Sequence, residues 1–258
     1  MISGRRCKAQ HQAQGQRRLV TQKATEVRRR RWWWISGIVL VVVVGLRFGL
    51  GLGLGGSSSH KSHLKLASLA TLSHLVSPPQ SGSLGPEGVL TPPVARLATT
   101  STDATGQIVN GISCDTNEQV VFHVHTHLTI FVDGTARQIP DGIGIVPPRT
   151  VQQTPQGPFV RSGGCFYWLH THAKDGIIHI ESPVQGNNYT LGDFFAIWGQ
   201  PLGSNQVGPS NGKVTAFFNG KVYLGNLRNI PLGNHVQIQL DVGRPLVGPE
   251  SIDFPSGL

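Results

Sequence analysis

Residues 120–140, "VVFHVHTHLTIFVDGTARQIP", determine the fold class that the sequence predicts. Apolar and polar side chains alternate on both sides of Asp133-Gly134, which is typical of strands with one buried face. Asp-Gly between two alternating runs is a strong signal for a two-residue hairpin turn. Asn219-Gly220 has the same setting in residues 214–225, "VTAFFNGKVYLG", and residues 235–243 predict a further strand. We therefore predict a mainly β domain, built as a largely antiparallel, hairpin-rich sheet or sandwich.

One short α-helix is predicted within residues 189–202, "YTLGDFFAIWGQPL". Thr190 is a good N-cap, and Asp193, three residues later, suits a capping box. Gly199 suits the position after the last helical residue, and Pro201 prevents the helix from continuing. We expect the aromatic residues of this helix to pack against a sheet rather than to bind a ligand.

Residues 167–183, "YWLHTHAKDGIIHIESP", are unusually rich in metal-ligating side chains for a pair of strands. If the Asp-Gly pair in this stretch forms a two-residue turn, His172 faces His179 and His170 faces Glu181. Side chains alternate across a sheet, so these four residues would share one face, within about 5–7 Å of one another. The apolar residues of both strands would share the other face, which predicts a core on one side and a site on the other.

The strand at residues 120–132 divides in the same way, because His123, His125 and His127 lie on the face opposite its apolar residues. From the first to the third histidine the strand spans about 13 Å, at about 3.3 Å per residue. That is too far for all three to hold one ion through Zn–N bonds of about 2.0–2.1 Å. Two of them could complete a site with the hairpin at 167–183, and we favour His125, the central one, as a ligand. The third would orient a ligand or start a second site.

Clustered imidazoles suit Zn, Cu, Ni and Fe(II), and regular spacing alone does not name the metal. Glu181 could be a ligand, a carboxylate that orients a ligating ring, or a general base if the protein is an enzyme. The alternative is a hydrogen-bonded network of histidines without a metal. For an isolated histidine such as His235, we favour a structural role over metal binding.

Three cysteines are present. Cys7 belongs to the basic N-terminal tail. Cys114 and Cys165 each precede a strand that carries histidines, so a disulfide between them is the leading expectation. A ligand role and free thiols remain as alternatives.

The net charge of +9 arises from the N-terminal end of the chain. Residues 1–31 hold ten Lys or Arg residues and one acidic residue, and the rest of the chain holds twelve of each sign. The basicity therefore indicates no binding groove in the folded part, and no nucleic-acid motif is present. We expect no nucleic-acid partner.

Residues 32–54 predict a single transmembrane helix. Apart from Arg47 they carry no charge, and as a helix they would span roughly 34 Å, more than the ~30 Å hydrocarbon core. The basic tail before them places the N-terminus in the cytoplasm, and tryptophans 32–34 suit the membrane interface. The alternative is a cleaved signal peptide and a secreted protein. In either case the remainder lies outside the cytoplasm.

The predicted organisation has four parts, which are a basic cytoplasmic tail (1–31), a membrane anchor (32–54), a flexible Gly/Ser/Pro-rich stalk (55–106) and a His-rich β domain (107–258). The β domain resembles a family of uncharacterised bacterial proteins that are membrane-anchored or secreted. Four motifs carry the resemblance, namely HVHxHLxIFVxG at 123–134, CxYWLHTHxxxGIIHIESP at 165–183, TLGxFFxIWGQPL at 190–202 and FPxGL at 254–258. The resemblance implies a bacterial, extracytoplasmic protein and no particular activity.

The leading functional expectation is binding of a transition-metal ion in the cell envelope, for sequestration, sensing or delivery. A second is a metal-dependent enzyme, an oxygenase or a hydrolase, that uses the His/Glu cluster. A third is a metal-free interaction module of the envelope. An enzyme needs an open coordination position and a pocket, whereas a binding protein can close its site. The sequence names no protein partner.

Overall fold

The computed structural model describes residues 64–79, 82–186 and 188–258, which belong to the compact unit Ser62–Leu258. The segments predicted as the cytoplasmic tail and the membrane anchor lie outside the described residues, as does Cys7. Within the described part of the chain, no helix has the length and apolar character needed to cross a bilayer.

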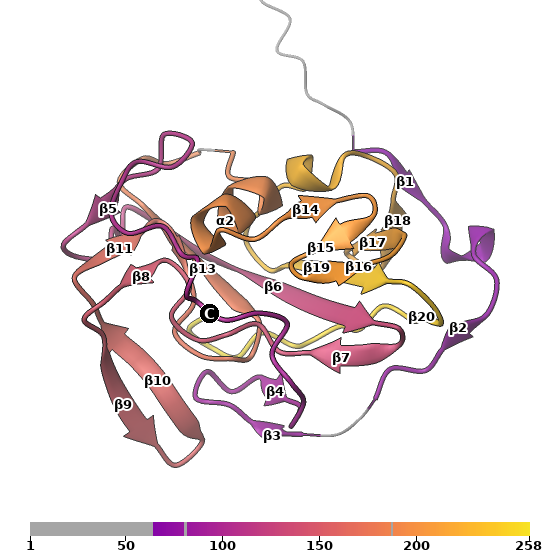
Figure 1. Ribbon diagram of the computed structural model, residues 1–258, viewed down its shortest axis with the longest axis horizontal. Coiled ribbons are helices and arrows are strands. Elements are labelled where there is room, and N and C mark those ends of the chain that lie inside the picture. The colour runs from indigo at the N-terminus through magenta and orange to yellow at the C-terminus, as the bar shows by residue number, and fades with distance from the viewer. Residues whose placement is uncertain (1–63, 80–81, 187) are drawn as a thin grey trace, which may run out of the picture. The chain divides into compact units, whose positions relative to one another are not determined.

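The unit is mainly β, and its central feature is an eight-stranded sheet (Figure 1). Seven of the strands form a continuous path, and the eighth, β7 (Thr135–Arg137), pairs with β6 off that path. In spatial order the path is β1 (Leu66–Ala67), β18 (Lys221–Tyr223), β17 (Val214–Phe218), β19 (Val236–Val242), β6 (Phe122–Val132), β13 (Ile177–Ser182) and β12 (Leu169–His170).

Five smaller sheets surround the main one. They are β9 (Thr150–Thr154) with β10 (Gly157–Ser162); β5 (Cys114–Asp115), β11 (Cys165–Tyr167) and β8 (Ile145–Val146); β14 (Leu202–Gly203), β15 (Gln206–Val207) and β16 (Ser210–Asn211); β2 (Leu75–Val76) with β20 (Leu246–Val247); and β3 (Ser83–Leu84) with β4 (Leu90–Thr91). Two 3-10 helices, η1 (Leu69–Thr71) and η2 (Leu227–Asn229), complete the described elements together with the helix α2.

The two predicted hairpins are confirmed. Asp133 and Gly134 connect β6 to β7 with φ angles of 49° and 75°, and Asn219 and Gly220 connect β17 to β18 with 47° and 74°. Two consecutive positive φ values are what a type I′ turn requires, and Asp, Asn and Gly tolerate them. Most strand pairs are antiparallel, but β6 pairs with β19 in parallel, and so does β2 with β20.

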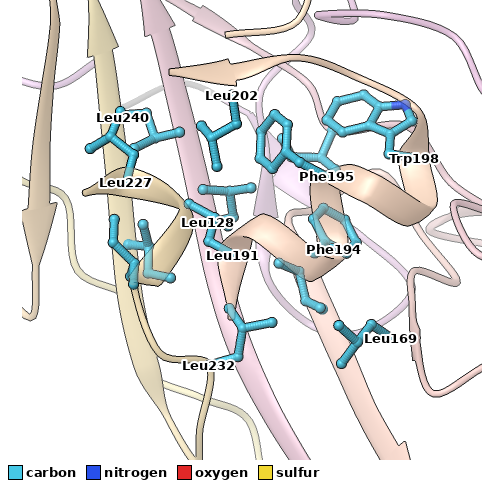
Figure 2. Packing of buried hydrophobic residues seen from close by; sticks show 14 of the residues in the cluster. Leu128, Leu169, Leu191, Phe194, Phe195, Trp198, Leu202, Leu227, Leu232 and Leu240 are labelled. Carbon is cyan, nitrogen blue, oxygen red and sulfur yellow. The ribbon is translucent and has the colours of Figure 1, made fainter. Parts of the chain in front are cut away.

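The predicted helix is α2, Leu191–Trp198, and its capping box has formed. The Thr190 side chain accepts a hydrogen bond from the Asp193 backbone N–H, the Asp193 carboxylate accepts one from the Thr190 N–H, and Gly199 ends the helix with φ 65°. Figure 2 shows the helix's aromatic side chains packed beside Leu128 of β6. The helix therefore covers the apolar face of the sheet and takes no part in a binding site.

The described part of the predicted stalk packs onto the β domain. Leu97 and Ala104 belong to the main core, and the Trp198 indole N–H donates to the Thr99 carbonyl at 2.9 Å. The strand pair β3–β4 places Glu87 at its turn, where Glu87 reaches the histidines described below. The composition indicated a linker because the apolar residues of this segment recur at neither helical nor strand spacing. The apolar residues that are buried, such as Val89, Leu97 and Ala104, lie singly along the segment, whereas Leu84 and Leu90 are exposed.

The register predicted for the hairpin at 167–183 is wrong by two residues. His170 pairs with His179, and Leu169 pairs with Ile180, so the strands are joined by residues 171–176 rather than by a two-residue turn. The connection is held by other segments, since Gly142 N donates to Thr171 O and Val160 N donates to His172 O. A shift of two residues keeps every side chain on its predicted face.

Candidate metal centre

The histidine face of the site is built by the pairing of β6 with β13. Their register places His125 opposite His179 and His123 opposite Glu181. Directly paired residues of adjacent strands have Cβ atoms about 4.5–5.5 Å apart, so these side chains meet on the surface of the sheet. On the opposite face the same two strands carry core residues such as Leu128 and Ile178.

His170 and His172 approach the same place from β12 and from the connection after it. His170 Nδ1 lies 2.8 Å from the Tyr167 carbonyl oxygen, and His172 Nδ1 lies 2.6 Å from the Val160 carbonyl oxygen. A carbonyl oxygen can only accept, so each Nδ1 carries the proton and each Nε2 is left with a lone pair. This arrangement orients a ligating imidazole and fixes its tautomer, as backbone carbonyls do in metal sites.

The two Nε2 atoms of His170 and His172 face each other at 3.1 Å. Burial lowers the pKa of His172 to about 4, with a further contribution from the charge of His179. Burial, followed by the charges of His172 and His179, holds the pKa of His170 well below its ordinary value. Both rings are therefore neutral at pH 7, and two unprotonated nitrogens point at each other. A cation between them would remove this repulsion.

A second group of donors surrounds His179 Nδ1. His125 Nε2 lies 3.1 Å from His179 Nδ1 and 3.1 Å from His123 Nε2. Glu181 Oε1 lies 3.1 Å from His123 Nε2 and 3.4 Å from His179 Nδ1. A tetrahedral ion with Zn–N bonds of about 2.0–2.1 Å holds its ligand atoms about 3.3–3.4 Å apart. The observed separations are close to the edges of such a tetrahedron.

Glu87 orients His179, a role that the sequence analysis did not predict. Its Oε1 lies 2.6 Å from His179 Nε2, so that nitrogen donates and Nδ1 faces the other histidines. Burial opposes a charge on His179, but hydrogen bonds to Glu181 and Glu87 outweigh it and raise the His179 pKa to about 9. The position therefore favours a positive charge, which can be a proton or a metal ion. One signal was available, since Glu87 is the sole Asp, Glu, Lys or Arg between Lys65 and Arg96.

Glu118 is a second acidic residue that the sequence analysis missed. Its Oε1 lies 3.5 Å from His172 Nε2, and its side chain is 36% exposed. Burial raises the pKa of Glu118, with a further contribution from the charge of Glu181. Together with His123, whose side chain is 40% exposed, Glu118 gives an otherwise buried cluster its contact with solvent.

Two groups of side chains thus have ligand atoms within 4.8 Å of one another, one made of His170, His172, His179 and Glu181 and the other of His123, His125 and His179. His127 lies apart from them, with its Nε2 3.0 Å from the Asp175 carbonyl oxygen. His235 also lies apart, stacked on Phe254 at a centroid distance of 4.4 Å.

Cys114 and Cys165 form a disulfide, with their Cα atoms 5.4 Å apart. They join β5 to β11, the strand that leads directly to His170. The disulfide therefore anchors the entry to the cluster and leaves neither sulfur as a ligand.

Phe159 and Phe166 pack against two of the clustered histidines. The Phe159 ring stacks on His172 at a centroid distance of 4.7 Å, and Phe166 lies 5.6 Å from His170. A cavity of about 450 Å³ lies nearby; His127 and Asp175 help to line it, and none of the clustered histidines does. The donor atoms are therefore largely buried, with contact to solvent on the side of His123 and Glu118, and the clustered histidines do not line this cavity.

Comparison of the chain with protein-family models, with curated protein sequences and with solved structures finds no match.

Proposed function

We propose that this protein binds a transition-metal ion through its histidine cluster and holds that ion outside the cytoplasm, for sequestration, sensing or delivery. The observation that carries the proposal is the pair of neutral imidazoles, His170 and His172, whose lone pairs face each other at 3.1 Å. A purely structural network would place a proton between the two Nε2 atoms. Here each ring instead carries its proton on Nδ1, which donates a hydrogen bond to a backbone carbonyl. Buried polar atoms are normally satisfied, and a metal ion satisfies these two.

The donor set supports a borderline metal. Imidazole nitrogens with one carboxylate suit Zn, Cu, Ni and Fe(II), whereas Mg²⁺ and Ca²⁺ prefer oxygen ligands. The packed surroundings support binding rather than catalysis, because the cavity of about 450 Å³ is lined by none of the clustered histidines. An enzyme would bring substrate to an open coordination position.

The cellular placement is proposed from two features. The basic tail and apolar segment at 32–54 fit a single-pass anchor with a cytoplasmic N-terminus. The disulfide between Cys114 and Cys165 fits an oxidising compartment. The bilayer and the metal ion are the partners that these features imply.

The test is calorimetric titration of the full-length chain, purified in detergent with a histidine-free tag, with Zn²⁺, Cu²⁺ and Ni²⁺. We expect saturable binding that His172→Ala weakens or removes. His235→Asn is the matched control, because asparagine tolerates the positive φ of 54° at this position and His235 lies apart from the cluster. If the wild type takes up no metal, or His172→Ala binds as the wild type does, the proposal is wrong.

A further inference from the structure

We propose that the cluster holds two metal ions bridged by Glu181, an inference that rests on the proposed metal binding. The outer ion would be bound by His123, His125 and His179, and the inner ion by His170 and His172. Each oxygen of Glu181 would bind one of the two ions.

The number of donor atoms exceeds the needs of one ion. The cluster presents five ring nitrogens and the two oxygens of Glu181, and structural zinc is almost always four-coordinate. One tetrahedral ion would leave the remaining donors buried with their lone pairs unused. Because unsatisfied buried polar atoms are costly, the cluster would be poorly built for a single ion.

The outer group has a complete set of ligands. Four of the separations among His123 Nε2, His125 Nε2, His179 Nδ1 and Glu181 Oε1 lie between 3.1 and 3.4 Å. His179 can offer only Nδ1, since its Nε2 donates to Glu87. With Nδ1 in the outer group, the nitrogens of His170 and His172 are left for another ion.

The inner group is completed by the second oxygen of Glu181. Glu181 Oε2 lies 3.9 Å from His170 Nε2 and is buried without a hydrogen-bond partner in the described structure. His170 Nε2 and His172 Nε2 lie 3.1 Å apart, and Glu118 Oε1 lies 3.5 Å from His172 Nε2 on the side that reaches solvent. Two imidazoles and two carboxylate oxygens again make a four-ligand set.

The bridge follows from the two different surroundings of the Glu181 oxygens. Oε1 faces the outer histidines, and Oε2 faces His170. Each oxygen of Glu181 therefore lies near the imidazole nitrogens of a different group, and each can bind a different ion. A carboxylate placed between two groups of imidazoles is the usual way to hold a pair of ions close together.

The number of zinc ions bound per chain tests this proposal. The full-length chain, purified in detergent with a histidine-free tag, is dialysed against Zn²⁺, and bound zinc per chain is measured by plasma mass spectrometry. We expect two ions in the wild type, one in His125→Ala, one in His172→Ala and none in the double variant. One ion in the wild type would overturn this inference and leave the proposed function standing, whereas no ion would overturn the proposed function itself.

Loading with Cu²⁺ tests the bridge separately. Two Cu²⁺ ions joined by Glu181 should give a spin-coupled electron paramagnetic resonance spectrum in the wild type. His125→Ala and His172→Ala should each give the spectrum of an isolated ion. A wild type that binds two ions with uncoupled spectra, or a single variant that loses both ions while its circular dichroism matches the wild type, would overturn the bridged arrangement.

Discussion

The two faces of the β6–β13 pair are both buried, but by different means. On one face Leu128 lies in the main hydrophobic core (Figure 2), and Ile130, Ile178 and Ile180 belong to the same core. On the other, histidines and Glu181 gather under aromatic side chains and the Glu87 turn. Burial stabilises the apolar face whatever is bound, since it follows from removing apolar area from water. The histidine face is polar and buried, so its stability depends on what occupies it. Four experiments test this difference.

The largest effect is expected on the apolar face. Leu128→Ala, at a side chain that is 1% exposed, should lower the free energy of unfolding by about 2–5 kcal/mol through lost burial and a residual cavity. Urea unfolding in the presence of a chelator measures this directly. Leu84→Ala is the control, because Leu84 is 58% exposed and its loss should change stability by less than about 0.5 kcal/mol. Equal effects of the two changes would contradict the assignment of Leu128 to the core.

Metal removal is expected to act on the other face. At a free metal concentration about tenfold above Kd, each of the two ions should add about 1.4 kcal/mol to the free energy of unfolding, together about 2.8 kcal/mol, and a chelator should remove this increment. Leu128→Ala should keep this metal-dependent increment, and the double change His125→Ala with His172→Ala should lose it. Urea unfolding with and without Zn²⁺ separates the two cases. An increment that survives in the double variant would place the ion elsewhere.

The division into faces could be predicted from the sequence because it depends on local alternation alone. Asp133-Gly134 and Asn219-Gly220 set their turns through their own backbone preferences. The register of β12 against β13 could not be predicted in the same way, because residues 171–176 are held by Gly142 and Val160 from distant segments. The predicted faces are nevertheless correct, because a register error of two residues leaves each side chain on the same face of the sheet.

The candidate site was predictable within the two histidine-rich stretches at 120–132 and 167–183, and not where a residue comes from a distant part of the chain. His123, His125 and His179 follow from alternation, and the structure brings them together with His170 and His172. Glu87 reaches His179 from 92 residues away along the chain, and such a contact leaves no periodic pattern. His127 has the spacing of a ligand, but its ring meets the Asp175 carbonyl instead.

Glu87→Gln should weaken metal binding about 10–100-fold, the usual cost of removing a group that orients a ligating histidine. Glutamine keeps an acceptor for the His179 N–H but loses the negative charge that raises the basicity of the ring. The affinity for Zn²⁺, measured by competition with a chromophoric chelator, checks this. Glu250→Gln removes a carboxylate that contacts none of the clustered histidines in the described structure and should leave the affinity unchanged. An unaltered affinity in Glu87→Gln would show that metal binding by His179 does not need the negative charge of Glu87.

Per pH unit, the pH dependence of binding should be the smallest of the four effects, and its sign follows from His179. Its pKa is raised to about 9, so at pH 7 the metal-free protein carries a proton on this ring that an ion must displace. The pKa values of His125 and His172 are lowered to about 4, chiefly by burial, so these rings release no proton at pH 7. We therefore expect affinity to rise about tenfold per pH unit, or about 1.4 kcal/mol, between pH 7 and 9.

The same proton links the stability of the metal-free protein to pH. A raised pKa in the folded state stabilises the protein fully below the unfolded value near 6.5, and this contribution is lost as pH rises through about 9. Calorimetry of Zn²⁺ binding in buffers of different ionisation enthalpy should accordingly give release of about one proton per chain at pH 7 and almost none at pH 10. The apolar face carries no such group, so Leu128→Ala should leave the proton count as it is. Release of several protons at pH 7 would show that the other imidazoles are charged before the metal binds, and the lone pairs of His170 and His172 would then not face each other.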